Sequence, residues 1–378
     1  MMKSVKNYFA RHHNNYRGWQ TDRKILVIES DDWGSTCMPS KEVFDDLIRE
    51  RYRVDLCPYT SFDSLASEKD LEQLFYVLME FKDRNGFHPV ITANAVMANP
   101  DFEKIRQNRF SEYIYKRFTD TLKKYPDHSG SFNLWKQGKE ENLFYPQFHG
   151  REHLNVRAWM DALDNKKSKY RSVFDREIFW LGAGEEDKTD VSIRAAFDAQ
   201  SAVDIEDHKK IIEEGLDLFE EIFGYRSESF IAPNFVFSGG LNSILYDGGV
   251  KYIQGMKYQK LPKLERNKNE LVRHFQGERN HSGQFYLVRN CVFEPSQFPE
   301  SYDNVEECLK GIKNAFLWRK PAIISAHRLN FIGHIVPENR ERNLKLFREL
   351  LKSILVQWPE VEFMTSAQLG DLIAESRN

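Results

Sequence analysis

Short runs of β-branched and other apolar residues alternate along this chain with longer segments in which apolar residues recur every three or four positions. The short runs predict buried strands, and the longer segments predict amphipathic helices. Alternation of the two is typical of an α/β fold with a mainly parallel sheet. The strands are predicted at residues 24–30, 89–94, 143–149, 228–233, 251–254, 284–290, 322–327 and 361–365. Eight strands are enough to form a barrel.

Helical spacing is clearest at residues 68–85, 204–223, 305–318 and 338–358. Ser67 is placed to cap the first of these helices, and Pro337 is placed in the first turn of the last. Gly224 and Pro359 follow two of the segments, where helices are expected to end.

The chain has 378 residues, of which 41% are hydrophobic and 29% charged, so it can bury a large core. We expect an N-terminal extension at 1–20 and one domain at 21–378, with less regular insertions near 109–141 and 257–283. The net charge of −3 is spread along the chain and gives no indication of a nucleic-acid partner. No transmembrane segment is expected. The oligomeric state has no sequence signal.

Four widely spaced cysteines and no evident secretory signal favour a reducing compartment, so we expect a cytoplasmic protein.

An acidic pair, Asp31 and Asp32, stands where the apolar run 25–28 ends, and Gly34 follows it in position for a tight turn. Ligands gather at the carboxyl ends of the strands in α/β sheets and barrels, so both acids lie where chemistry is usually done. The alternative is that one of them only caps a helix. A second acidic pair, residues 45–46, lies in an amphipathic helical pattern and is expected to be structural.

His149 and His153 are four residues apart, directly after a predicted strand. If they share one face of a helix, both imidazoles can bind one cation. Asp32 then provides a third ligand. The order of residues is not that of H-E-x-x-H, which disfavours a zincin protease. The alternative is two surface histidines at a helix start. The predicted strand 322–327 ends in His327, whose imidazole can donate a proton near neutral pH.

With these motifs the chain resembles the polysaccharide deacetylases of carbohydrate esterase family four. The resemblance implies an irregular (β/α) barrel of about seven strands, as in the glycoside hydrolase/deacetylase superfamily. It implies that Asp31 is the general base and His327 the general acid. Asp32, His149 and His153 become the ligands of a divalent metal, with Zn²⁺ as the default.

The resemblance spans about residues 24–330, and the sequence departs from the family pattern within it. The family has an Arg-x-Pro-aromatic motif whose Arg pairs with the base, whereas residues 231–234 of this chain read Ile-Ala-Pro-Asn. Another group must then orient Asp31. Arg328 and Arg151 are the substitutes considered.

The implied reaction is hydrolysis of a C–N (non-peptide) bond, removing an acetyl group from an N-acetylated sugar or polysaccharide; an O-acetylated substrate stays open. Polar and aromatic residues at strand exits are candidates for sugar binding: Trp33, Asn94, Asn234 and Arg328. For each of them, packing or turn capping is the alternative. The segment 182–187 is a candidate lid, although a solvated acidic turn is the simpler interpretation.

Two other functions stay open. A glycoside hydrolase on a related barrel needs two carboxylates on opposite sides of the bond, so it requires a partner such as Glu185 for the adjacent Asp31 and Asp32. A non-catalytic carbohydrate-binding protein is the other alternative, since the family arginine beside Asp31 is absent.

Overall fold

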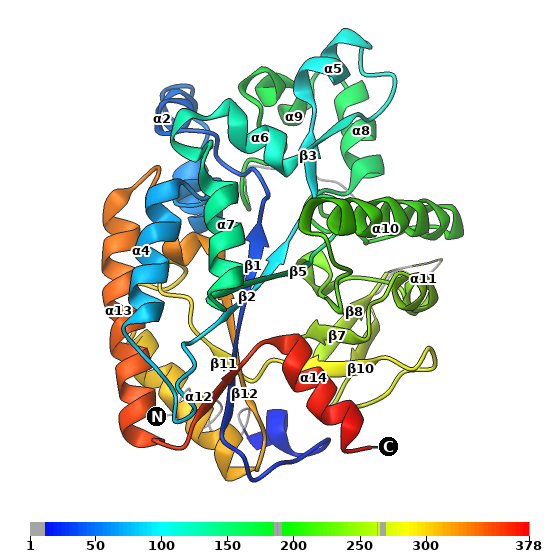
Figure 1. The fold of residues 1–378 in the computed structure, drawn as a ribbon. Coiled ribbons are helices and arrows are strands. Elements are labelled where there is room, and N and C mark those ends of the chain that lie inside the picture. Colours follow the sequence, from blue (N-terminus) through cyan, green and yellow to red (C-terminus); the bar gives the residue numbers. More distant parts are fainter. Residues whose placement is uncertain (1–11, 185–186, 188–190, 263, 265–269, 378) are drawn as a thin grey trace.

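The computed structural model describes residues 12–184, 187, 191–262, 264 and 270–377 (Figure 1). Nine strands of these residues form one curled sheet in the order β10-β7-β6-β5-β2-β1-β12-β11, with β13 also paired to β1. All pairings in this sheet are parallel. The strands are β1 (Ile25–Trp33), β2 (Ile91–Ala95), β5 (Phe144–Phe148), β6 (Ser229–Phe230), β7 (Tyr252–Gly255), β10 (Phe285–Val288), β11 (Cys291–Val292), β12 (Ala322–His327) and β13 (Glu362–Met364).

The two ends of this sheet meet through the chain itself. β10 and β11 are the outermost strands of the order, yet only Arg289 and Asn290 separate them in sequence. The amide of Arg289 donates to the carbonyl of Gly255 at 2.9 Å, and the amide of Asn290 donates to that of Ile323 at 3.2 Å. Because these adjacent residues bond to β7 and β12, they close the curled sheet into an irregular (β/α) barrel.

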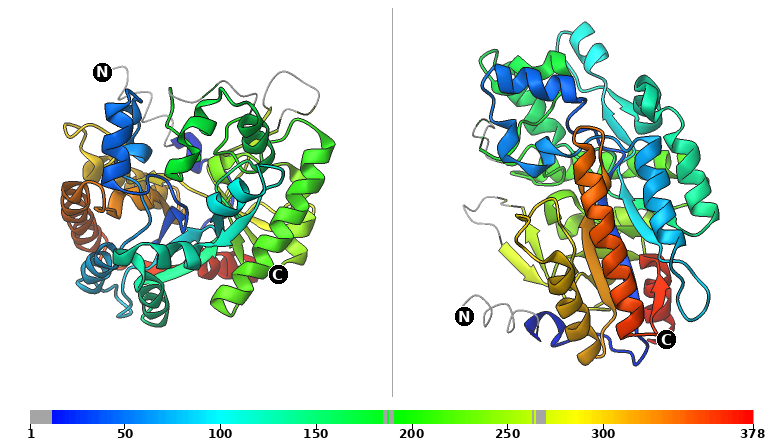
Figure 2. Two further views of the ribbon diagram at one scale, coloured as in Figure 1. Left: turned by 90° about the horizontal axis from the view of Figure 1, so that it is seen from above. Right: turned by 90° about the vertical axis from the view of Figure 1, so that its left-hand side faces the viewer.

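Helices surround the outside of the sheet (Figure 2, left). The longest, α10, α12 and α13, and the shorter α4 pack apolar faces on its outer surface. The helices are α2 (Lys41–Arg49), α3 (Pro58–Ser61), α4 (Glu68–Met79), α5 (Phe102–Gln107), α6 (Phe118–Lys124), α7 (Ser131–Glu140), α8 (Val156–Asp164), α9 (Lys169–Val173), α10 (Ala202–Phe223), α11 (Asn242–Asp247), α12 (Asn304–Leu317), α13 (Pro337–Gln357) and α14 (Ser366–Glu375).

Alternation along β1 separates the inside of the barrel from the outer core. Ile25 and Val27 face inward and pack with Leu369 and Ile373 of α14, which fills the barrel near the strand starts. Two residues further on, the same inward face carries Glu29 and then Asp31. The barrel interior therefore changes from apolar to charged toward the carboxyl ends of the strands.

All eight predicted strands are present, and residues 322–327 match β12 at both ends. The short strand β11 was not predicted. The four predicted helices are also present, with Ser67 forming a capping box and Pro337 in the first turn. Gly224 ends α10 in a left-handed conformation, with φ 75°. The acidic pair 45–46 lies in α2, as expected.

The stretches expected to be irregular contain defined elements. Residues 109–141 include β4 (Tyr115–Arg117), α6 and α7, and β4 pairs antiparallel with β3 (Ala98–Pro100). The second stretch contains an antiparallel pair, β8 (Tyr258–Leu261) and β9 (Glu270–Arg273). The division into an N-terminal extension and one catalytic domain stays a prediction.

Across the described ranges, no helix combines the length and the apolar character needed to cross a membrane. Cys37, Cys57, Cys291 and Cys308 are buried free thiols.

Candidate active site

Asp31 and Asp32 lie at an irregularity in β1 rather than at a helix start. The register with β2 shifts between Ser30 and Trp33, so two residues of β1 oppose one residue of β2. Asp32 has a φ of 72°, in the left-handed region that non-glycine residues seldom occupy. Such a bulge breaks the alternation of side chains along a strand. Both neighbouring carboxylates consequently reach the buried end of the barrel, where each is about 2% exposed.

Asp32 lies next to both predicted histidines, His149 and His153. Its Oδ1 lies 3.3 Å from Nε2 of His149 and 3.1 Å from Nε2 of His153. All three side chains are buried, and one ligand atom from each lies within 4.8 Å of the others. A tetrahedral ion with bonds of about 2.0 Å needs ligand atoms roughly 3.3 Å apart. The observed separations from Asp32 fit that requirement.

Hydrogen bonding of His149 supports a cation at this position. Its Nδ1 lies 2.8 Å from the carbonyl oxygen of Ile231, which can only accept, so Nδ1 carries the proton. In the neutral ring, Nε2 then presents a lone pair to an Asp32 oxygen that is also an acceptor. A cation between these two acceptors would satisfy both of them. Burial lowers the pKa of His153 to about 4, so that ring is neutral at pH 7 and can also be a ligand.

The predicted helical geometry of the histidine pair is wrong, although the residues are brought together. β5 ends at Phe148, and α8 begins only at Val156, so both histidines lie in the loop between them. Gly150 turns the chain here with a φ of 120°, a conformation that requires glycine. The two rings are 5.2 Å apart because the loop folds back, not because they are one helical turn apart.

Asp31 is bound by Arg289, which comes from the link between β10 and β11. Two guanidinium nitrogens of Arg289 donate to the two oxygens of Asp31, each at 2.6 Å, and Nε donates to Glu29 at 2.5 Å. Asn94 donates to Asp31 at 2.7 Å. Burial alone raises the pKa of the Asp31 carboxyl, but Arg289 outweighs it and holds that pKa at about 2. The Asp31 carboxylate is therefore ionised at neutral pH.

Neither arginine proposed from the sequence orients Asp31. Arg328 binds Asp63 through two nitrogens, at 3.0 and 2.8 Å, and Arg151 pairs with Glu152 and with Glu214 of α10. Sequence reasoning missed Arg289. The available signal was a charged residue near the end of the apolar predicted strand 284–290.

His327 lies opposite Asp31 in the β1–β12 register, with its Nε2 3.8 Å from Asp31 Oδ2. Its Nδ1 is 2.5 Å from an oxygen of Glu294, and the ring of Tyr59 packs edge-on against it. Burial lowers the pKa of His327, but the charge and hydrogen bond of Glu294 dominate and raise it to about 9. His327 is therefore an imidazolium at neutral pH. Glu294 was not predicted.

The predicted sugar-binding residues divide into two groups. Trp33 and Arg328 are 1% and 0% exposed, so neither side chain is available to a sugar. Trp33 belongs to the core, where it packs edge-on against Trp135. Asn94 is fully buried and bonds to Asp31, whereas Asn234 is exposed in a turn after β6.

The candidate lid at 182–187 is described only in part, because residues 185–186 lie outside the described residues. Glu185, the candidate second carboxylate of a glycoside hydrolase, is one of these two residues. Gly182 packs against Cys57 and Thr60.

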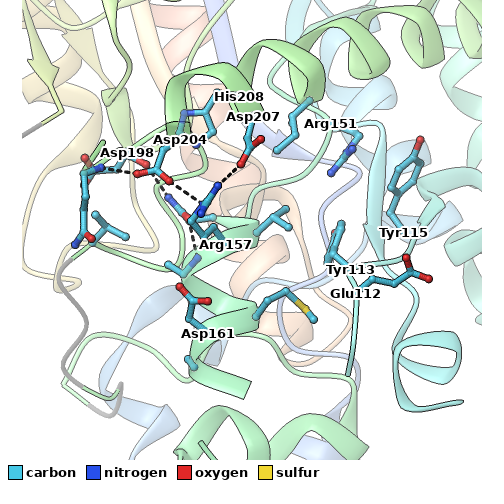
Figure 3. A pocket seen from close by; sticks show the side chains of 18 of the residues that line it. Glu112, Tyr113, Tyr115, Arg151, Arg157, Asp161, Asp198, Asp204, Asp207 and His208 are labelled. Carbon is cyan, nitrogen blue, oxygen red and sulfur yellow. Dashed lines mark hydrogen bonds and ion pairs between the residues drawn. The ribbon is translucent and has the colours of Figure 1, made fainter. Parts of the chain in front are cut away.

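A large cleft lies beside this site but is not part of it. It has a volume of about 1220 Å³ between α8 and α10, and Figure 3 shows Arg157 reaching toward Asp204 and Asp207. Among the described residues that line it, Arg151 and Asn155 belong to the loop of the histidine pair, but none is a predicted catalytic or metal-binding residue. The predicted catalytic and metal-binding residues lie instead in the barrel interior.

No protein-family model matches the sequence, and no curated protein matches it significantly. Among solved structures, a candidate glycoside hydrolase/deacetylase from Parabacteroides distasonis has a similar fold, with 8% identity, coverage of 95% of this chain and 73% of that chain, and a TM-score of 0.50. A candidate polysaccharide deacetylase from Mycobacterium smegmatis is 11% identical, with coverage of 96% of this chain and 94% of that chain and a TM-score of 0.48. The peptidoglycan deacetylase PdaC from Bacillus subtilis is 10% identical, with coverage of 94% of this chain and 93% of that chain and a TM-score of 0.36. The similarity to the Parabacteroides distasonis protein concerns the fold, which in this chain is an irregular (β/α) barrel.

Proposed function

We propose that this protein is a metal-dependent hydrolase that removes an acetyl group from an N-acetylated sugar or polysaccharide. One observation carries the proposal: an ionised carboxylate, a protonated imidazole and an Asp/His/His set occupy one buried site at the carboxyl ends of the strands. A carbohydrate substrate is supported by the motif resemblance and by the name of the structural neighbour from Parabacteroides distasonis.

The chain's own residues divide the proton transfers. Asp31, kept ionised and oriented by Arg289 and Asn94, accepts a proton from the attacking water. His327, kept protonated by Glu294, donates a proton to the departing nitrogen. Asp32, His149 and His153 are the groups that would hold a divalent metal. When bound, such a metal, with zinc as the default, acidifies water and polarises the acyl carbonyl.

The two alternative functions are a non-catalytic carbohydrate-binding protein and a glycoside hydrolase. A non-catalytic role was considered because no arginine followed the family motif, and Arg289 now provides that contact to Asp31. A glycoside hydrolase still needs a second carboxylate at roughly 5–9.5 Å across the bond. Its suggested partner, Glu185, lies outside the described residues. The cytoplasmic location stays a prediction.

The deciding experiment uses an N-acetylglucosamine oligosaccharide labelled in its acetyl groups. The purified protein is incubated with it after loading with Zn²⁺. Released acetate with the chain length unchanged supports deacetylation. Shortened chains with no free acetate would contradict the proposal in favour of glycoside hydrolysis.

We predict that Glu294→Gln moves the alkaline limit of activity to lower pH. The general acid must keep its proton, so kcat/KM should fall as the pH rises through about 9, the pKa of His327. Removing the negative charge of Glu294 lowers that pKa, and activity is then lost nearer neutrality. Glu300→Gln is the control, because Glu300 is exposed and pairs with Arg342. Identical alkaline limbs in the pH profiles of wild type and Glu294→Gln would show that His327 is not the acid.

A further inference from the structure

Arg194 is a buried cation at the active site to which none of the roles above has been assigned. It lies in the segment between α9 and α10 and is 7% exposed. Its Nη2 donates to Oδ2 of Asp32 at 3.0 Å, on the oxygen that does not face the two histidines. Asp32 is therefore bound on one side by the candidate metal ligands and on the other by Arg194.

The bonding of Arg194 is incomplete compared with the other arginines at the site. Arg289 and Arg328 each form a two-nitrogen fork on a carboxylate. Within the described part of the chain, Arg194 forms a single hydrogen bond, to Asp32. Nε of Arg340 is fully enclosed and has no hydrogen-bond partner among the described residues. The unbonded nitrogens of Arg194 are not enclosed in this way. They therefore border open space, and they remain as donors for a ligand.

Two aromatic rings hold the guanidinium in place. Its central carbon lies 4.7 Å from the ring centre of Tyr59 and 4.7 Å from that of Trp180. Cation–π contacts of this kind restrict the plane of the guanidinium without using its N–H groups. Tyr59 also packs edge-on against His327, so Arg194 and the general acid lie around the same ring. A substrate bound between His327 and Asp32 lies within reach of Arg194.

The charges at the site indicate what kind of group Arg194 binds. Arg289 is more than balanced by its two carboxylate partners, Asp31 and Glu29, and His327 is balanced by Glu294. Asp32 alone balances Arg194, and it would also have to balance a divalent metal, because histidine ligands bring no negative charge. The loaded site then has an excess of positive charge beside a guanidinium with free donors. A planar guanidinium binds carboxylates especially well.

We propose that Arg194 binds a carboxylate of the substrate, so that the enzyme prefers acidic N-acyl amino-sugar chains to neutral ones. This inference rests on the proposed deacetylase function. Arg194 is then a specificity-determining residue, and Tyr59 and Trp180 position it.

The test compares two tetrasaccharides. One contains only N-acetylglucosamine and is neutral, and in the other N-acetylglucosamine alternates with glucuronic acid, which makes it acidic. Wild type, Arg194→Gln, Arg194→Lys and Arg157→Gln are loaded with Zn²⁺ and compared in kcat/KM. Arg157 is the control, because it is half exposed on α8 and pairs with Asp204 and Asp207. Wild type and Arg157→Gln should prefer the acidic chain. Arg194→Gln should lose roughly 10- to 100-fold on that chain and much less on the neutral one. Arg194→Lys should fall between, because it keeps the charge and loses the fork.

Two further measurements separate this inference from the proposed function. Zn²⁺ affinity, measured by calorimetry, should change little in Arg194→Gln; an equal loss on both sugars together with weaker Zn²⁺ binding would mean that Arg194 only holds Asp32. If wild type releases acetate from neither sugar, the deacetylase proposal fails. Calorimetric binding of the acidic tetrasaccharide still tests Arg194: about 10-fold or greater weakening in Arg194→Gln supports the inference, and equal or absent binding in both proteins overturns it.

Discussion

Arg289→Met is expected to destabilise the fold and to abolish turnover near neutral pH. Arg289 is fully buried and is the charge partner of both Glu29 and Asp31, so its loss leaves two buried carboxylates without their guanidinium partner. Breaking a buried pair in this way typically costs about 3–5 kcal/mol in the free energy of unfolding. Urea unfolding at pH 7 measures that loss.

The same variant should change the pH dependence in a defined direction. The pKa of Asp31 in the folded protein, about 2, lies below its ordinary value. Its ionisation therefore stabilises the fold at neutral pH, and this contribution is lost as the pH falls toward 2. Without Arg289, burial raises that pKa, so both the stabilisation and the ionised base are lost at higher pH.

Arg328→Met is the matched control, because Arg328 is equally buried but pairs with Asp63 instead of the base. It should lose comparable stability while its acid limb of activity stays that of wild type. The account of Asp31 would be wrong if Arg289→Met kept both the wild-type turnover and the wild-type acid limb.

Asp31→Asn is expected to reduce kcat by about 10²- to 10⁴-fold, the usual contribution of a general base. The amide cannot accept the proton from water at neutral pH, although it nearly preserves the shape of the side chain. Metal content should stay at the wild-type level, because the ligand set uses Asp32 and not Asp31. Turnover and metal content are measured on the same preparation.

Asp63→Asn serves as the comparison, because Asp63 is a buried, arginine-paired aspartate outside the ligand set. It should keep most of its kcat. Equal sugar binding with no turnover in either wild type or Asp31→Asn would instead favour the non-catalytic carbohydrate-binding alternative.

Much of the barrel could be predicted from the sequence because its strands are short apolar runs bounded by polar residues and turns. The run that ends in His327 fixed both limits of β12. The acidic pair could be placed at the end of the first strand because Asp31 and Asp32 follow its apolar run closely. The bulge and the left-handed Asp32 could not be predicted, since they depend on pairing with β2.

The supporting charges were harder to predict because their partners are distant in sequence. Arg289 and Glu29 are 260 positions apart, and Glu294 is 33 positions from His327. Single-sequence patterns contain no information on such pairings. The histidine pair was found through helical spacing, although a glycine turn is what brings the two rings together. Arg194 had no sequence signal, because it lies in an irregular segment far from Asp32 in the chain.

The most direct test of the central claim is calorimetric titration of the metal-free protein with Zn²⁺. Wild type and Asp31→Asn should each bind one ion per chain with similar affinity. Asp32→Ala, His149→Ala and His153→Ala should each lose more than the ~10- to 100-fold that removal of an outer-shell partner costs. If wild type binds no ion, or if all three variants bind as tightly as wild type, then Asp32, His149 and His153 do not form a metal site.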